Sequence, residues 1–305
     1  QPGHSLWGIN GEMILATPAA PMGESGPSTF EFVTELAREL STGRVELPSF
    51  PDAAARLQQA LADSNVTAER IALVLGTDAG LTARVLTMAN STLLHRGGKP
   101  VSDLKLAVTR IGHENIRVAA LAYASAQLKR APELAHIRGD LEVCWREGIR
   151  VAALAHAIAR ETRAARGDES LLVGLLHNIG KVYIIARAAR DSVLHRSPEI
   201  KANVIRDWYP GIGQALVENW KLPEQVAAAV GSQLERSRQH AGHPDLADLL
   251  IVAVDLARQL AAGRSDEAQV AMLPAARALG LDDAMAVRVV LESQTDLEML
   301  QAALG

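Results

Sequence analysis

Residues 174–181 read Gly-Leu-Leu-His-Asn-Ile-Gly-Lys, and this octet is the most informative part of the sequence. Two polar side chains, His177 and Asn178, interrupt an apolar run that starts at Leu171 and ends before Gly180. We interpret the run as a buried helix that stops at the glycine. A buried polar side chain needs hydrogen-bond partners, so the pair marks either a satisfied position in the core or a functional site.

Helix start signals occur along the rest of the chain. Thr67, Asp78 and Asp245 each precede a helical apolar pattern and are good N-cap residues. Ser102 is predicted to cap a further helix that ends at Gly112. Hydrophobic residues make up 48% of the chain but aromatic residues only 3%, so Ala, Leu, Val and Ile must fill the core. We therefore predict an all-α protein with closely packed helices.

Charge and cysteine content exclude several classes of protein. The 31 basic and 35 acidic side chains give a net charge of -4, which excludes a generic polycation. The single cysteine, Cys144, excludes an intrachain disulfide and favours a reducing compartment. No window reaches the roughly 18 uninterrupted apolar residues of a membrane span, and the first residues do not form a signal peptide. We predict a cytoplasmic protein without membrane insertion.

The octet resembles the Gly-Leu-Leu-His-Asp-Ile-Gly-Lys core of the HD superfamily of metal-dependent phosphohydrolases, with Asn178 in place of the aspartate. Further segments resemble one branch of that superfamily, namely the double-proline entry at 47–51, the motif at 78–91 that ends in Ala-Asn-Ser, the helix at 101–112, Trp145, and the Trp-Lys-Leu-Pro step at 220–223. From their order and spacing over residues of about 30–260, the chain is identified as a member of the HDOD (HD-related output domain) family.

This resemblance implies a single helical domain with two lobes. Residues 28–305 would form the HDOD domain, with an N-terminal lobe at about 28–135 and an HD-like lobe at about 136–305. Nine of the first 27 residues are Gly or Pro, so we expect residues 1–27 to be a flexible leader or a segment added for expression.

The resemblance also implies a site. HD enzymes hold one or two divalent metals with a first histidine, the His-Asp pair and a late aspartate, and the metal activates a water molecule. Here Glu147 lies near the position of the first histidine, His177 and Asn178 form the pair, and Asp255 matches the late aspartate. Because an amide is neutral, it cannot bridge two metals as a carboxylate does. We predict a vestigial pocket of these four residues, with no catalytic residue, no cofactor and no metal. If a metal did bind, its ligands would be His177, Asp255 and Glu147.

The function implied is that of a non-catalytic output or scaffolding domain in bacterial signal transduction. Its partners would be signalling proteins, of cyclic-dinucleotide or two-component pathways. One alternative is a residual metal-dependent phosphohydrolase or nucleotide-binding HD domain. A second is a DNA-binding regulator, because residues 67–90 superficially resemble a helix-turn-helix whose reading face would carry Thr82, Arg84 and Thr87. Acidic residues near that face oppose phosphate contacts, so we expect no nucleic-acid partner. The oligomeric state stays open.

Overall fold

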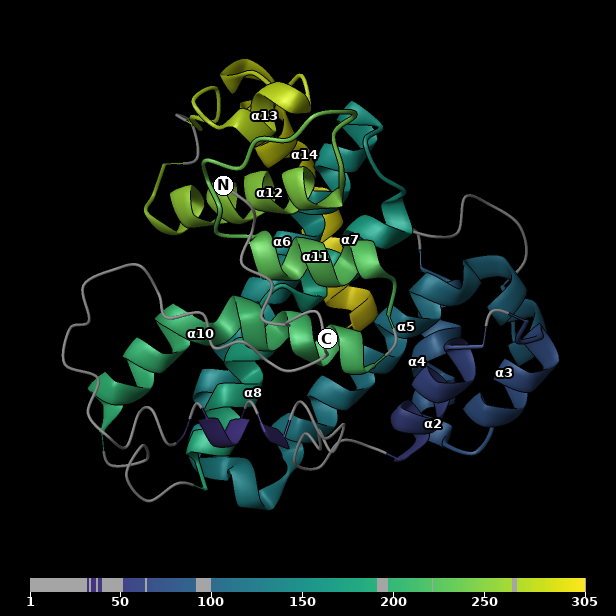
Figure 1. The fold of residues 1–305 in the computed structure, drawn as a ribbon. Helices are drawn as coiled ribbons and strands as arrows, with labels where there is room; N and C mark the ends of the chain where they lie inside the picture. Colours follow the sequence, from purple (N-terminus) through teal and green to yellow (C-terminus); the bar gives the residue numbers. More distant parts are fainter. Residues whose placement is uncertain are drawn as a thin grey trace.

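The computed structural model describes residues 32, 34–36, 38–39, 52–63, 65–91, 100–190, 197–220, 222–264 and 268–304 (Figure 1). These residues form helices and turns without a strand, which confirms the predicted all-α class. The predicted leader at 1–27 lies outside the described residues.

The N-terminal lobe contains the helices α2 (Asp52–Leu61), α3 (Ala68–Leu75), α4 (Ala79–Ala89) and the first part of α5 (Leu104–Arg130). Two predicted caps are confirmed, since the side chains of Thr67 and Asp78 accept the backbone N–H groups of Arg70 and Leu81 at 3.3 and 2.9 Å. Each cap satisfies an N–H group that has no partner within its own helix. Local polar chemistry therefore sets where α3 and α4 begin.

Helix α5 differs from the prediction at both ends. Its N-cap is Asp103, which accepts the Leu106 N–H at 2.8 Å, and not Ser102. Gly112 adopts a positive φ of 75°, as its predicted role requires, but the chain resumes the helix directly and continues to Arg130. The prediction that this helix ends at Gly112 was therefore wrong. The kinked α5 packs on α2, α3 and α4 in one lobe and on α6 and α7 in the other.

Asn90, in the Ala-Asn-Ser motif, has a structural role. Its side-chain amide donates to the Val101 carbonyl at 2.8 Å and its oxygen accepts the Val101 N–H at 2.7 Å. The side chain thus pairs with a backbone unit as a neighbouring strand would. This contact joins the end of α4 to the segment that leads into α5.

The second lobe contains η1 (Pro132–Ile137), α6 (Arg138–Thr162), α7 (Gly167–Leu176), α8 (Ile179–Ala188), α10 (Pro198–Asn219), α11 (Glu224–Ser232), α12 (Leu246–Ala261), α13 (Pro274–Ala278) and α14 (Asp283–Leu304). Helix α6 packs against α7, α12 and α14 (Figure 1). Two glycines set the spacing between neighbouring helices. A Cβ atom on Gly174 would lie 2.4 Å from the Ala152 Cα atom, and one on Gly180 would lie 2.0 Å from the Tyr209 carbonyl oxygen. Only glycine fits at either position.

The first described helical residues pack on the second lobe, beside α8 (Figure 1). The Glu39 carboxylate accepts the Tyr183 hydroxyl at 2.8 Å and the Arg187 Nε–H at 3.0 Å. Phe32 and Leu36 are buried in the same core. The described residues between 32 and 39 therefore contact the second lobe. The lobe boundary near residue 135 stays a prediction.

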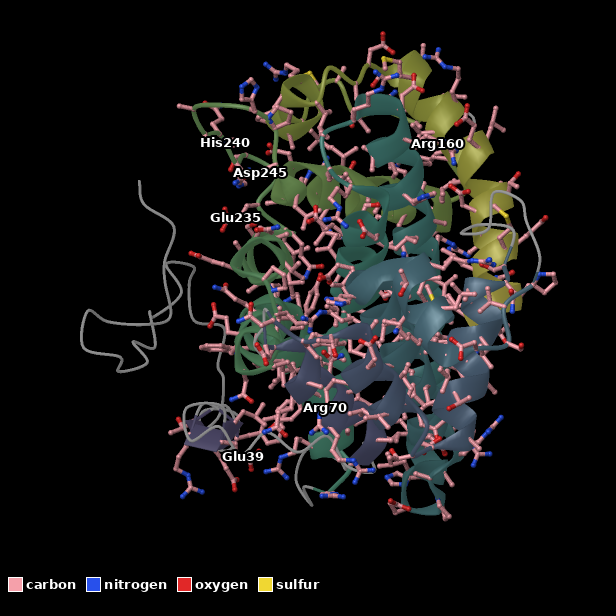
Figure 2. The ribbon with its side chains drawn as sticks, turned by 90° about the vertical axis from the view of Figure 1, so that its right-hand side faces the viewer. Glu39, Arg70, Arg160, Glu235, His240 and Asp245 are labelled. Atoms are coloured by element: carbon pink, nitrogen blue, oxygen red, sulfur yellow. The ribbon has the colours of Figure 1, made fainter. Side chains whose placement is uncertain are left out.

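The last helix is held to α6 by a buried carboxylate. Asp296 of α14 accepts Arg160 Nη1 at 3.1 Å and lies 3.0 Å from His156 Nδ1. Arg160 lies beside α14 in Figure 2. Val289 and Leu300 are buried in the main core. The final helix is thus part of the domain.

Residues 167–188 are long and apolar enough to cross a membrane, and 78% of the apolar window is buried inside the fold. Burial of this kind is typical of the core helix of a soluble protein. The cytoplasmic location stays a prediction.

Candidate functional site

The four predicted site residues come from three parts of the second lobe. Glu147 lies on α6, His177 and Asn178 form the junction between α7 and α8, and Asp255 lies on α12. Of these, His177, Asn178 and Asp255 are buried, and Glu147 is partly exposed. The close approach of α6 and α7 at Gly174 brings the junction against α6.

His177 has one satisfied and one unsatisfied ring nitrogen. Its Nδ1 atom lies 2.7 Å from the Gly174 carbonyl oxygen. Because a carbonyl only accepts, Nδ1 carries a proton. The Nε2 atom is buried without a hydrogen-bond partner, and the Glu147 carboxylate is 3.9 Å away.

Glu147 is paired with a cation of the chain itself. Both carboxylate oxygens lie 3.0 Å from Lys181 Nζ, which also lies 4.8 Å from the centre of the Tyr209 ring. Burial alone would raise the pKa of Glu147, but His177 and Lys181 together outweigh burial and lower the pKa to about 2. Glu147 is therefore an ionised carboxylate in contact with an ammonium group.

Asn178 uses its amide as a donor. Its Nδ2 atom donates to the Cys144 carbonyl oxygen at 2.6 Å and so joins the α7–α8 junction to α6. A carboxylate at this position could not donate unless it were protonated. The amide that replaces the aspartate of the HD pattern thus has a structural partner.

Asp255 also has partners on both oxygens. Arg236 Nη1 lies 2.9 Å from Oδ1, and Gln259 Nε2 donates to Oδ2 at 2.8 Å. Nearby, Gln233 donates to the His177 carbonyl oxygen at 2.6 Å. Residues that follow α11 therefore reach both His177 and Asp255.

The structure does not gather Glu147, His177 and Asp255 as a metal-binding group. Within the described ranges, one set of three candidate ligand atoms lies within 4.8 Å of one another, and it belongs to His240, Asp245 and Asp248. Arg238 bonds both carboxylates of that set at 2.7 Å, so we interpret it as an ion-pair network. Of the three predicted ligands, only His177 keeps a ligand atom without a partner.

A small cavity of about 30 Å³ adjoins the Asn178 side chain and Cys144. It is lined mainly by apolar residues of α5 to α8, among them Leu121, Leu128, Leu141, Leu175, Ile179 and Val182. A cavity of this size has room for about two water molecules.

Sequence reasoning missed two site residues. Lys181 directly follows Gly180, where the sequence predicted a helix end. That prediction was wrong, because the break lies at His177 and Asn178 and α8 runs through Gly180 and Lys181. Arg236 lies outside any helix and pairs with a residue 19 positions later, so no periodic pattern could indicate it.

The helix-turn-helix alternative finds little support in the packing of α3 and α4. Thr82 donates to the Leu75 carbonyl at 2.9 Å and, like Arg84, is partly buried. A Cβ atom on Gly80 would lie 2.6 Å from the Tyr123 ring, so α4 presses directly on α5. Thr82 and Arg84 are therefore partly covered within the lobe, whereas Thr87 is exposed.

Comparison with known proteins gave matches by family and by structure. The family model of the HDOD domain matches residues 47–235. No curated protein matches the chain. A suggested metal-dependent phosphohydrolase from Shewanella amazonensis SB2B is similar in fold, with a TM-score of 0.63 and 22% identity over 92% of this chain and 100% of that one.

Two further solved structures are similar. An HDOD domain protein of unknown function from Geobacter sulfurreducens has a TM-score of 0.57 and 24% identity, over 90% of this chain and 98% of that one. A suggested signal transduction protein from Marinobacter aquaeolei VT8 has a TM-score of 0.56 and 21% identity, over 93% of this chain and 66% of that one. At these identities the likeness establishes the fold alone.

Proposed function

Because the chain belongs to the HDOD domain family, we propose that it is a non-catalytic output domain that binds partner proteins in a bacterial signalling pathway. The signalling context is supported by the similar fold of the Marinobacter protein. Partners from cyclic-dinucleotide or two-component pathways are part of the proposal. Recognition by helical surfaces would be the mechanism, with no chemical step at the pocket.

One observation carries the non-catalytic part of this proposal: both carboxylates of the predicted ligand set are paired with cations of the chain. Lys181 contacts both oxygens of Glu147, and Arg236 contacts Asp255. A divalent metal would have to displace these cations from both carboxylates. Because Asn178 is an amide, the site also lacks the carboxylate that would bridge two metals and compensate for that displacement. The donor set therefore does not fit the metal centre of an HD hydrolase.

Elemental analysis of protein purified without chelators tests this part of the proposal. We expect well below one equivalent of Mn, Fe, Zn or Mg, and the same result for His177→Ala. Hydrolysis of a chromogenic phosphodiester should not exceed the rate without protein when Mn²⁺ is added. About one equivalent of metal that is lost in His177→Ala, or hydrolysis that is lost in that variant, would establish a phosphohydrolase instead.

Partner binding needs a separate measurement. Cross-linking in cells that express the chain, followed by mass spectrometry, should identify a signalling protein that binds the purified chain at a saturable site. The His177→Ala variant should bind that protein equally, because the pocket has no chemical role. A salt-dependent DNA shift, abolished by substitutions on α4, would instead support the DNA-binding alternative.

A further inference from the structure

The segment between α11 and α12, residues 233–244, is fixed to the second lobe by four of its side chains. We name this segment the strap. Gln233 and Arg236 reach the candidate site, through the His177 carbonyl and Asp255. Arg238 and His240 reach the start of α12. His240 and Asp245 lie close together at the edge of the fold in Figure 2.

His240 faces a hydrogen-bond acceptor at each ring nitrogen. Its Nε2 atom lies 2.6 Å from Asp248 Oδ2, and its Nδ1 atom lies 3.3 Å from the Ala241 carbonyl oxygen. An ionised carboxylate and a carbonyl can only accept, so the protonated ring alone can donate to both. The contact with Asp248 is also the main reason that the pKa of His240 is raised above its ordinary value.

Asp248 is the buried end of this contact, with a side chain only 1% exposed. Its Oδ1 atom accepts Arg238 Nη1 at 2.7 Å, and its Oδ2 atom accepts the Asp245 N–H at 3.1 Å. The second bond is half of the capping box that starts α12. His240 therefore contacts a carboxylate that also determines where α12 begins.

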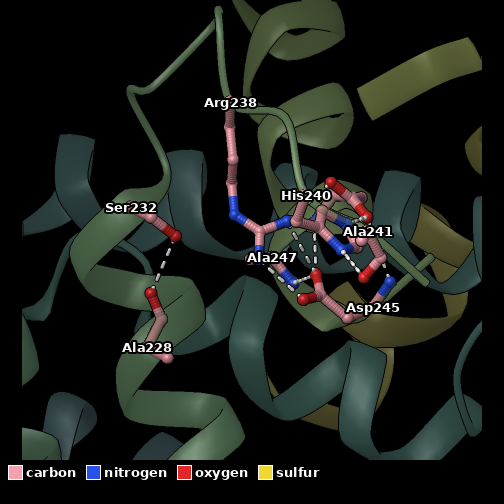
Figure 3. Close-up of polar contacts among 8 residues, drawn as sticks. Ala228, Ser232, Arg238, His240, Ala241, Asp245 and Ala247 are labelled. Carbon is pink, nitrogen blue, oxygen red and sulfur yellow. Dashed lines mark hydrogen bonds and ion pairs between the residues drawn. The ribbon is translucent and has the colours of Figure 1, made fainter. Parts of the chain in front are cut away.

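The charges in this network balance only when His240 is protonated. The charged groups that act on it are Asp245 and Asp248 of α12 and Arg238 of the strap, and Arg238 contacts both carboxylates (Figure 3). Two negative charges then face two positive ones. Loss of the His240 proton leaves a net negative charge around the buried Asp248, which is unfavourable. The neutral ring can keep Nε2–H on Asp248, but it loses the Nδ1–H bond to the Ala241 carbonyl oxygen and the charge that strengthens the contact with Asp248.

We propose that the strap is a proton-sensitive latch, in which protonated His240 holds residues 238–244 firmly on the first turn of α12 and deprotonation loosens this contact. Gln233 and Arg236 keep the other end of the strap beside His177 and Asp255. Loosening would therefore increase the mobility of a segment whose other end contacts the candidate site. The latch is a property of the fold whether or not that site binds a ligand.

The direction of the pH dependence follows from the raised pKa. The stabilisation from the charged contact is fully present below the pKa of an unfolded histidine, about 6.5, and is lost as the pH rises through the higher value of the folded protein. The strap is therefore held more firmly in mildly acidic than in mildly alkaline solution.

Hydrogen–deuterium exchange of the full chain, with EDTA present and corrected for the intrinsic effect of pH, tests the latch. Peptides that cover residues 238–248 should lose protection between about pH 5.5 and 8.5, the direction that a raised pKa of His240 requires. Peptides of α6 should not change. His240→Gln should have low protection at every pH, and His240→Lys, which stays charged, should keep high protection at every pH.

His243→Gln provides the matched control, because His243 is an exposed histidine of the same strap, three residues further on. It should behave like the natural protein. A histidine NMR titration, with the His240 signal assigned by its absence in His240→Gln, should give a midpoint above about 6.5. Protection that is independent of pH in the natural protein, or equal in His240→Gln, would overturn the proposal. So would an ordinary midpoint for His240.

Discussion

Replacing Asn178 by aspartate restores the HD pair in sequence, and we expect it to destabilise the fold. The Asn178 amide donates to the Cys144 carbonyl oxygen at 2.6 Å, in a position where the side chain is 3% exposed. An ionised aspartate would put a carboxylate oxygen against that carbonyl oxygen, with the Glu147 carboxylate on the same side of α6. The substitution thus exchanges an attraction for a repulsion.

The size of the effect follows from two contributions. Removing a donor from a buried hydrogen bond costs about 1–3 kcal/mol. Burial that raises the pKa of the new carboxyl group by about two units adds roughly 2.7 kcal/mol at neutral pH. Because the contributions overlap, we expect Asn178→Asp to lose about 3 kcal/mol of unfolding free energy at about pH 7. Protonated aspartate can donate to the Cys144 carbonyl, so the loss should shrink towards roughly 1 kcal/mol as the pH falls to about 4.

Urea unfolding followed by tryptophan fluorescence, at several pH values, measures this loss. Asn65→Asp is the matched control, since Asn65 is exposed in the turn before α3, and its effect should stay within about 0.5 kcal/mol. An Asn178→Asp variant as stable as the natural protein at neutral pH would refute the role assigned to the amide. A rise of several degrees in the Tm of the natural protein on addition of Mn²⁺ would refute the poor metal fit.

Three further outcomes follow from the packing and charges of the second lobe. Gly180→Ala should lower the free energy of unfolding by about 1–3 kcal/mol or more, because its Cβ would lie 2.0 Å from the Tyr209 carbonyl oxygen. Gly139→Ala, which has open space around it on α6, should raise that free energy by up to about 1 kcal/mol. Thermal unfolding of the two variants measures the difference. Burial raises the pKa of Glu147, but His177 and Lys181 outweigh burial and lower it to about 2. The ionised Glu147 therefore stabilises the fold above about pH 4.5, and this stabilisation is lost as the pH falls to about 2. In acid titrations, Glu147→Gln should lose less stability over that range than the natural protein. Burial raises the pKa of the Cys144 thiol to about 11, so a thiol reagent at about pH 8 should label the unfolded chain and leave the native protein unlabelled; rapid native labelling would contradict the burial.

Sequence reasoning succeeded where the determining contacts are local. Thr67 and Asp78 cap helices through bonds three residues long, and His177 and Asn178 interrupt an apolar run that is buried as predicted. The pattern could not show that Lys181 contacts Glu147, because 34 residues separate them and their meeting depends on how α6 packs against α7. It also could not show that the helix resumes after Gly112, since a positive φ is equally suited to the end of a helix and to a kink.

The contact of Glu39 with Tyr183 has a consequence for synthesis of the protein. These residues are 144 positions apart in the chain. At translation rates of about 5–20 residues per second, Glu39 leaves the ribosome roughly 7–30 s before its partner exists. During that interval the apolar side chains of Phe32 and Leu36 lack much of the core in which they are buried. The nascent chain therefore exposes an apolar surface that chaperones can bind, and the N-terminal residues join the fold only after α8 has been made.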